Sequence, residues 1–140
     1  VQNAVRTRAT TGASLSEPRS FGNAGFDVLL KYWGWSFAVE YMNRVVANPV
    51  VGSETIFSGE GLSAQGGRMF RSDWELAGRY STLRARPAAR TEHPWQTQWT
   101  LGINHFFRGH RVKTQADLTL DQWETRADRW IARFQLELGI

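Results

Sequence analysis

The final segment of this chain alternates between apolar and polar residues with a period of two, and this pattern restricts the fold more than any other feature. Successive side chains of a β-strand point to opposite faces of the sheet, so the members of one phase share a face. The two phases are Trp130, Ala132, Phe134, Leu136, Leu138 and Ile140 against Arg129, Arg133, Gln135, Glu137 and Gly139. Ile131 is the only large apolar residue in the polar phase. The segment is therefore predicted to be a strand with one apolar face and one charged or polar face.

The same alternation recurs through most of the chain and predicts roughly seven or eight antiparallel strands. The clear examples occupy residues 25–32, 35–47, 74–82, 95–107 and 111–121. Two weaker segments, 1–9 and 61–70, complete the set. The second is weak because Ala64, Gln65, Gly66 and Gly67 have poor strand propensity. No helix is predicted, and all four prolines, Pro18, Pro49, Pro87 and Pro94, fall in predicted loops.

The connections between these segments alternate between short and long, which is an independent signal. Short turns are predicted around Gly34, Arg71–Ser72 and Arg108–Gly109. Longer polar connections are predicted at roughly 10–24, 48–60, 85–94 and 122–127. Bacterial outer-membrane barrels have short periplasmic turns and longer extracellular loops, so this rhythm favours such a barrel over a soluble β-sandwich.

Aromatic side chains gather near the predicted strand ends. The chain contains seven Trp and eight Phe, although its mean hydropathy of −0.43 is polar. Membrane barrels carry a girdle of aromatic residues at each interface. The residues predicted to form these girdles are Trp33, Trp35, Trp74, Trp95, Trp99, Phe106, Phe107 and Trp130. The alternative is a soluble core, which would place Trp in the middle of strands as readily as at their ends.

These signals predict an all-β fold, namely an antiparallel up-and-down transmembrane β-barrel, with residues 1–140 as a single barrel segment. The chain has no apolar run long enough for a transmembrane helix. Two alternatives remain open. A closed eight-stranded barrel would fill its interior with side chains and act as an anchor or as a subunit of a larger membrane assembly. A soluble ligand-binding barrel would turn its apolar phase inward, and alternation alone does not decide which phase faces in.

Several short motifs are similar to a known family. Trp74–Ser81 (WELAGRYS) and Trp99–Asn104 (WTLGIN) are followed by a strand ending in Asp121 and by the terminal Arg133–Leu138 (RFQLEL). Together with the segment Phe26–Tyr41, they resemble the C-terminal part of the phosphate-selective porin O/P family, over roughly residues 20–140. This resemblance implies a homotrimer of barrels with about sixteen strands each, wide enough for an aqueous channel.

The same resemblance has limits. The family's constriction and anion-binding loop lie upstream of the matching motifs, so no ligand residue is carried over. The chain ends in Ile140, where many outer-membrane barrels end in Phe, but its alternating C-terminal strand is otherwise of the kind that the barrel-assembly machinery reads. Because the chain begins at Val1 without a signal peptide, we expect a processed chain or a fragment of a larger barrel.

The expected function is passive diffusion of small solutes across a bacterial outer membrane, with anions such as phosphate as the favoured solutes. The cations in the predicted lumen phase are Lys31, Arg44, Arg79, Arg111, Lys113, Arg129 and Arg133. The acids of the same phase are Asp27, Glu40, Glu75, Asp117, Asp121 and Glu137, so a mixed-charge wall held by ion pairs is the alternative interpretation. The expected partners are outer-membrane lipid and lipopolysaccharide. The arginines of loop Arg84–Arg90 suit contact with lipopolysaccharide phosphates or another partner, but a solvated loop is the favoured interpretation. Nucleic acid is disfavoured because the basic residues that give the net charge of +4 are scattered.

No enzymatic activity and no cofactor are expected. His93, His105 and His110 have no nucleophile or carboxylate at a recognisable spacing, and a Gly-x-Ser-x-Gly elbow is absent. No His-x-His or His-x-x-x-His pair indicates a metal site. The chain has no cysteine, so thiolate ligands and disulfides are excluded.

Overall fold

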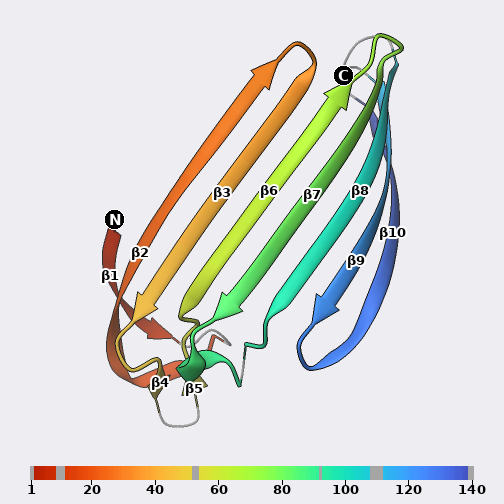
Figure 1. The fold of residues 1–140 in the computed structure, drawn as a ribbon. Coiled ribbons are helices and arrows are strands. Elements are labelled where there is room, and N and C mark those ends of the chain that lie inside the picture. Colours follow the sequence, from red (N-terminus) through yellow and green to blue (C-terminus); the bar gives the residue numbers. More distant parts are fainter. Residues whose placement is uncertain (1, 9–11, 52–53, 92, 108–111, 139–140) are drawn as a thin grey trace.

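The computed structural model describes residues 2–8, 12–51, 54–91, 93–107 and 112–138 (Figure 1). These residues form one eight-stranded antiparallel sheet with the order β1-β2-β3-β6-β7-β8-β9-β10, together with a two-stranded ribbon, β4-β5. The strands of the large sheet are β1 (Gln2–Arg8), β2 (Ser14–Tyr32), β3 (Trp35–Val46), β6 (Gly59–Met69), β7 (Trp74–Ala85), β8 (Gln96–Phe107), β9 (Val112–Trp123) and β10 (Arg126–Leu138). Because each strand pairs with the next strand of the sheet along the chain, the predicted all-β, antiparallel, up-and-down topology is confirmed.

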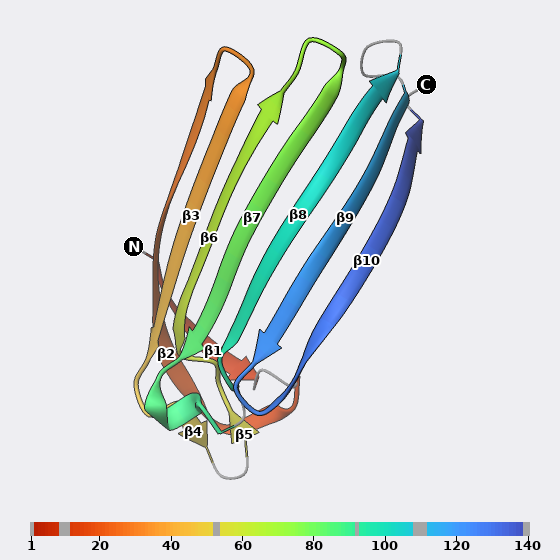
Figure 2. The same ribbon diagram turned by 45° about the vertical axis from the view of Figure 1, so that its right-hand side comes forward.

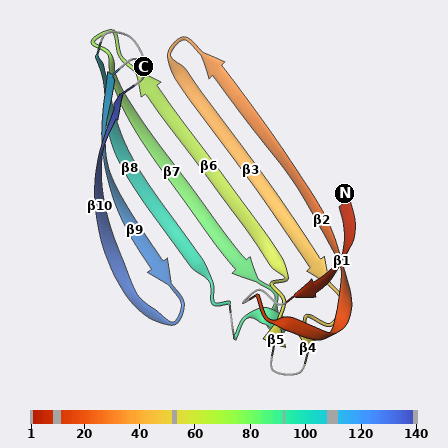
Figure 3. The ribbon, with the colours of Figure 1, turned by 180° about the vertical axis from the view of Figure 1, so that it is seen from behind.

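The sheet is curved and open. Its two edge strands are β1, which pairs only with β2, and β10, which pairs only with β9. Figures 2 and 3 show the strands running side by side with a common tilt. The sheet curves at both edges, toward β10 at one edge and toward β1 at the other. The β1–β2 pairing covers Ser14–Asn23 alone, so the second half of β2 has β3 as its only partner.

The register places like residues in rows across the whole sheet. One row on the apolar face consists of Val28, Val39, Ala64, Tyr80, Trp99, Leu120 and Trp130, each directly opposite the next. A neighbouring row on the other face consists of Asp27, Glu40, Ser63, Ser81, Gln98, Asp121 and Arg129. The alternation in the sequence has therefore become two faces of opposite character, as a period of two requires.

The two described turns at one end of the sheet, called here the short-turn end, are tight. Trp33 and Gly34 join β2 to β3 with φ values of 47° and 74°, which is the backbone of a type I′ hairpin turn. Such a turn is unusual for Trp, because an L-residue pays a steric cost at positive φ. The Trp33 carbonyl accepts a 2.6 Å hydrogen bond from Arg68, and the Met69 amide donates to the Gly34 carbonyl at 2.7 Å, so strand β6 supports this conformation.

Segment 61–70, whose strand propensity is low, is confirmed as strand β6. Two of its glycines, Gly66 and Gly67, lie where neighbouring side chains leave little room for a Cβ. A Cβ on Gly66 would lie 3.3 Å from the ring of Phe37, and one on Gly67 would lie 2.9 Å from Glu75 Oε1 and 3.0 Å from Ser36 Oγ. Cross-strand packing therefore overrides the local propensity in this strand.

Two of the predicted long connections are wrong. Strand β2 already begins at Ser14, so most of segment 10–24 is strand. Strands β9 and β10 are joined by Glu124 and Thr125 alone, so segment 122–127 is a tight turn. Pro18 consequently lies inside a strand. It is tolerated there because β3 begins to pair only at Phe21, and because the β1–β2 register is irregular next to it.

The opposite, long-loop end of the sheet carries the two long connections, 47–58 and 86–95 (Figure 1). The first contains β4 (Val50–Val51) and β5 (Glu54–Thr55), and the second contains the single helical turn η1 (Pro87–Ala89), none of which was predicted. They enclose the small apolar core of the described residues, which consists of Val46, Ile56, Ala85 and Ala89. The Arg86 amide donates a 2.8 Å hydrogen bond to the carbonyl of Ser58, and this bond ties the two connections together.

Candidate functional site on the polar face

The apolar face of the sheet is uncovered over its whole width. Leu30, Phe37, Leu101 and Phe134 are 48% to 75% exposed, and no described element packs on them. Soluble monomeric proteins rarely expose a continuous apolar surface of this extent. This face therefore needs an apolar environment outside the described residues.

The predicted girdle residues lie on the apolar face, in a turn, in a long connection and, in one case, on the polar face. Trp35, Trp74 and Phe107 lie on the apolar face toward the short-turn end, and Trp33 lies in the turn itself. Trp99 and Trp130 share a row in the half nearer the long-loop end, and Trp95 lies just before β8 in the long connection. Phe106 differs from this prediction: it alternates with Phe107 and pairs with Lys113, so it lies on the polar face.

The predicted lumen cations largely share one face. Lys31, Arg44, Arg79, Lys113, Arg129 and Arg133 all lie in rows of the polar face. Arg111 lies outside the described residues. The predicted acids Asp27, Glu40, Glu75, Asp117, Asp121 and Glu137 occupy the same face.

Ion pairing divides these charges unevenly. Arg129 pairs with Asp121 and Arg133 with Asp117, each at 2.9 Å, so these four charges of the last hairpin neutralise one another. Within the described ranges, no carboxylate lies within ion-pair distance of the remaining four cations of the predicted lumen phase. Those cations are Lys31, Arg44, Arg79 and Lys113.

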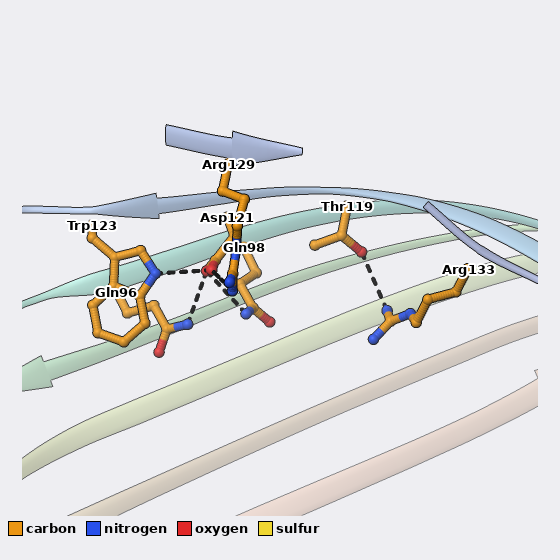
Figure 4. A network of polar contacts seen from close by, with 7 residues as sticks. All are labelled: Gln96, Gln98, Thr119, Asp121, Trp123, Arg129 and Arg133. Carbon is orange, nitrogen blue, oxygen red and sulfur yellow. Dashed lines mark hydrogen bonds and ion pairs between the residues drawn. The ribbon is translucent and has the colours of Figure 1, made fainter. Parts of the chain in front are cut away.

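The Asp121 carboxylate is the centre of a polar network with four hydrogen-bond donors on this face (Figure 4). Its Oδ1 accepts hydrogen bonds from Gln96 at 2.9 Å and Gln98 at 3.0 Å, and its Oδ2 accepts from the Trp123 indole and from Arg129, both at 2.9 Å. The side chain is fully buried, and the four donors come from three neighbouring strands. A buried carboxylate is stable only when it is paired and hydrogen-bonded, and these four donors meet that requirement.

Two smaller networks continue along the same face. Thr119 accepts a 3.3 Å hydrogen bond from Arg133 (Figure 4). It also shares a 2.8 Å hydrogen bond with Thr100, so this network joins β8, β9 and β10. Asn104 donates to Glu75 at 2.8 Å. The buried polar side chains of this face, Asn104, Thr119 and Asp121, thus each have hydrogen-bond partners on neighbouring strands, in contrast to the exposed apolar side chains behind them.

A hollow of about 790 Å³ opens on this face beside these networks. Its cationic lining comes from Arg79, Lys113 and Arg133, and its acidic lining from Glu75 and Asp117. Both acids already have hydrogen-bonding partners, namely Asn104 and Arg133. The hollow therefore contains two cations, Arg79 and Lys113, that have no ion pair among the described residues.

A cluster at the long-loop end fastens connection 86–95 to the β9–β10 turn. The Arg90 guanidinium binds the Glu124 carboxylate through two nitrogens, and the Trp95 amide donates to the same carboxylate at 3.3 Å. Arg90 and Arg84 lie 4.1 and 5.3 Å from the centre of the Trp95 ring. The hydrogen bonds from Arg90 lower the pKa of Glu124 below its ordinary value.

The histidines do not form a catalytic or metal-binding arrangement among the described residues. His105 lies on the apolar face, stacked on Trp74 at 4.3 Å and edge-on to Phe107 at 4.1 Å. His93 contacts Phe57 edge-on at the long-loop end, and His110 lies outside the described residues. Over the described ranges, no three His, Asp or Glu side chains come close enough together to hold a metal ion.

Sequence reasoning missed four contributors to the polar face. Trp123 falls in the predicted connection 122–127, but its indole donates to Asp121 on the polar side. Gln96 and Gln98 were assigned only as polar-phase residues, although their shared phase with Asp121 was a usable signal. Phe57 was placed in a loop, and nothing in the sequence indicated that this loop packs back onto the sheet.

Comparisons with known proteins give no relative for this chain. No protein-family model matches it, and no curated protein and no solved structure matches it either. In the part of the chain that the structure describes, no helix has the length and apolarity needed to cross a membrane.

Proposed function

We propose that this chain is the C-terminal part of an outer-membrane porin, a transmembrane β-barrel that lets small solutes diffuse passively across a bacterial outer membrane. The observation that carries the proposal is the division of one open sheet into two faces. One face is apolar and exposed from β2 to β10, and the other holds charged side chains in ordered networks. A barrel wall between lipid and an aqueous lumen needs this division.

The ends of the sheet support the same proposal. Trp35 and Trp74 lie toward one end of the apolar face, and Trp99 and Trp130 lie toward the other, where two interfacial girdles would be. Arg68 is a cation on the apolar face near the short-turn end. Its guanidinium donates to the Trp33 carbonyl and lies 4.9 Å from the centre of the Trp35 ring. An arginine that snorkels toward a membrane interface makes contacts of this kind.

We propose further that additional strands close the barrel. Strand β10 and the second half of β2 each have one unpaired side, and open edges do not persist in a lipid bilayer. The resemblance to the phosphate-selective porin O/P family implies about sixteen strands and a homotrimer. Lipopolysaccharide is the proposed outer-leaflet neighbour, and β10 the proposed signal for the barrel-assembly machinery.

Anions are the proposed preferred solutes. Lys31, Arg44, Arg79 and Lys113 face the proposed lumen without an ion pair among the described residues. The corresponding acids without an ion pair or hydrogen bond there are Asp27, Glu40 and Glu137. The excess is small, so we expect modest selectivity from this part of the wall.

The second candidate is a closed eight-stranded barrel that acts as an anchor or as a subunit of a larger membrane assembly. The observation that favours it is the strand number of the sheet, which is eight. A barrel of that size fills its interior with side chains and does not conduct.

Single-channel conductance separates the two candidates. The full native protein would be inserted into a planar lipid bilayer under a salt gradient. A steady, anion-selective conductance is the expected result. A folded protein that inserts and shows no conductance would end the porin proposal in favour of the closed barrel.

A further inference from the structure

A second hollow, of about 340 Å³, lies at the long-loop end of the sheet and differs in character from the rest of the polar face. Its side chains include Met42, Leu83 and Phe57, with Arg44 and Glu40 among the charged ones. Met42 and Leu83 occupy one row of the polar face, with Gly61 between them, and both are more than a third exposed. An apolar patch is thus set into a face that is otherwise polar.

Phe57 makes this patch concave. Gly59 shares a row of the polar face with Arg44 and Ala85, so a Cβ added to it would point to that side. Such a Cβ would lie 2.9 Å from Phe57 Cζ. The Phe57 ring therefore lies over the polar face at Gly59, beside the row that contains Met42 and Leu83. The connection 47–58 thus forms one wall of the hollow.

Arg44 gives the hollow one oriented positive charge. Its Nε donates to Asn23 Oδ1 at 2.9 Å, and its guanidinium carbon lies 5.3 Å from the centre of the Phe21 ring. Within the described residues, no carboxylate lies within ion-pair distance of it. The contacts with Asn23 and Phe21 fix the guanidinium and leave its two terminal nitrogens for a ligand.

Glu40 sets the opposite limit of the hollow. It lies four residues before Arg44 on β3, about 13 Å away along the strand, and on the same face. Asp27 is directly opposite Glu40 on β2, so the charge at this end is negative. A ligand that spans the hollow meets the Arg44 cation at one end, apolar side chains in the middle and the Glu40 carboxylate at the other.

We propose that this hollow binds small monocarboxylates with an apolar body, such as a medium-chain fatty acid anion. The carboxylate lies against Arg44, and the apolar body lies against Met42, Leu83 and Phe57. Access of such solutes from an aqueous lumen rests on the proposed porin function, whereas the binding itself does not. Ligand sites of this kind are mostly apolar with a few placed polar groups, and about 340 Å³ is within their usual size range.

The charge arrangement predicts a specific order of affinity. Hexanoate satisfies both the cation and the apolar lining. Adipate has the same number of carbons but places a second carboxylate near Glu40, so repulsion and desolvation weaken its binding. Inorganic phosphate can bind Arg44 but does not cover the apolar side chains, so their burial adds nothing to its binding free energy.

Isothermal titration of the full native protein in detergent with hexanoate, adipate and phosphate tests the proposal. We expect hexanoate to bind at least about tenfold more tightly than adipate. Arg44→Gln should weaken hexanoate binding about tenfold, because a charged hydrogen bond is lost, and Leu83→Thr should weaken it about threefold. Arg126→Gln is the matched control, because Arg126 lies on the same face beside Trp123 and outside the hollow.

Equal affinity for hexanoate and adipate, or equal losses in the Arg44→Gln and Arg126→Gln variants, would overturn the proposal. Heat-modifiable migration on gels checks that each variant is folded. Conductance of the same preparation separates this proposal from the porin function. Hexanoate binding without conductance keeps the site and ends the porin proposal, and conductance without hexanoate binding does the reverse.

Discussion

Asp121 on β9 and Arg129 on β10 form a 2.9 Å ion pair in which the carboxylate is fully buried and the arginine side chain is 63% exposed. Arg129 is one of four hydrogen-bond donors to the buried Asp121 carboxylate. The remaining donors, Gln96, Gln98 and Trp123, belong to β8 and β9. Asp121 thus fixes the position of the last hairpin on the strand before it.

Removing this carboxylate should loosen the last hairpin. Asp121→Ala leaves four donors facing a space without an acceptor, and we expect it to lower the free energy of unfolding by about 3 kcal/mol. Urea unfolding of the protein in detergent or lipid vesicles, followed by Trp fluorescence, measures the change. Asp128→Ala is the control, because Asp128 is exposed and, among the described residues, bonds only to Gln122, and it should change stability by less than about 0.5 kcal/mol. Similar losses in both variants would mean that Asp121 has no special role.

Two glycines should respond very differently to the same added methyl group. A Cβ on Gly59 would lie 2.3 Å from the Arg84 carbonyl oxygen and 2.8 Å from Ala85 Cα, which are backbone atoms that cannot turn aside. Gly59→Ala should therefore destabilise the protein by about 1–3 kcal/mol and disturb the β6–β7 pairing.

Gly78→Ala is the matched control for that substitution. Its Cβ would have the Thr100 carbonyl oxygen at 3.9 Å as its nearest neighbour, so we expect a change of less than about 0.5 kcal/mol. Thermal unfolding midpoints on heat-modifiability gels compare the two variants. A Gly59→Ala protein as stable as Gly78→Ala would show that β7 shifts freely at this point.

The contact between Glu124 and Arg90 should make connection 86–95 sensitive to acid. Arg90 lowers the pKa of Glu124 in the folded protein below its ordinary value of 4.5. The carboxylate therefore stabilises the contact fully above pH 4.5, and this stabilisation is lost as the pH falls through the lower folded-state pKa. Hydrogen exchange at the Trp95 amide, which donates to Glu124, should accelerate over that window beyond the intrinsic pH dependence.

Glu124→Gln should remove this extra acceleration and raise exchange at Trp95 at neutral pH. Arg126→Gln is a suitable control, since Arg126 lies over the Trp123 ring and not against Glu124. An unchanged exchange profile in Glu124→Gln would contradict a role for this carboxylate in holding the connection.

The strands and their faces were predictable from the sequence because a period of two maps directly onto geometry. Even β6, with Gly66 and Gly67, was predicted as part of the recurring alternation, although the strand propensity of its residues is poor. The ends of the strands were less predictable. The stretch before Phe21 is polar and contains Pro18, which local propensity assigns to a loop, yet pairing with β1 makes it strand. Strand propensity reflects the residues of the segment itself, whereas the pairing partner β1 is a separate segment of the chain.

The interaction partners of individual side chains could not be predicted from the sequence either. The predicted lumen cations all belonged to one phase, but only the register shows that Arg129 and Arg133 are neutralised while Arg79 and Lys113 are not. The hollow under Phe57 depends on the path of a long connection, and no periodicity specifies such a path.

Which face meets lipid can be decided with two single-cysteine variants, because the chain contains no cysteine. Leu101 lies on the apolar face, and Gln65 lies on the polar face at nearly the same level of the sheet, next to the row that contains Gly66 and Leu101. A fluorophore on Leu101→Cys in brominated-lipid vesicles should be strongly quenched by the lipid and little affected by iodide in the buffer. The same fluorophore on Gln65→Cys should show the reverse pattern, because the proposed lumen is aqueous. If the apolar phase instead faced the interior of a soluble barrel, neither label would be quenched by lipid, and the label at position 101 would be the one shielded from iodide.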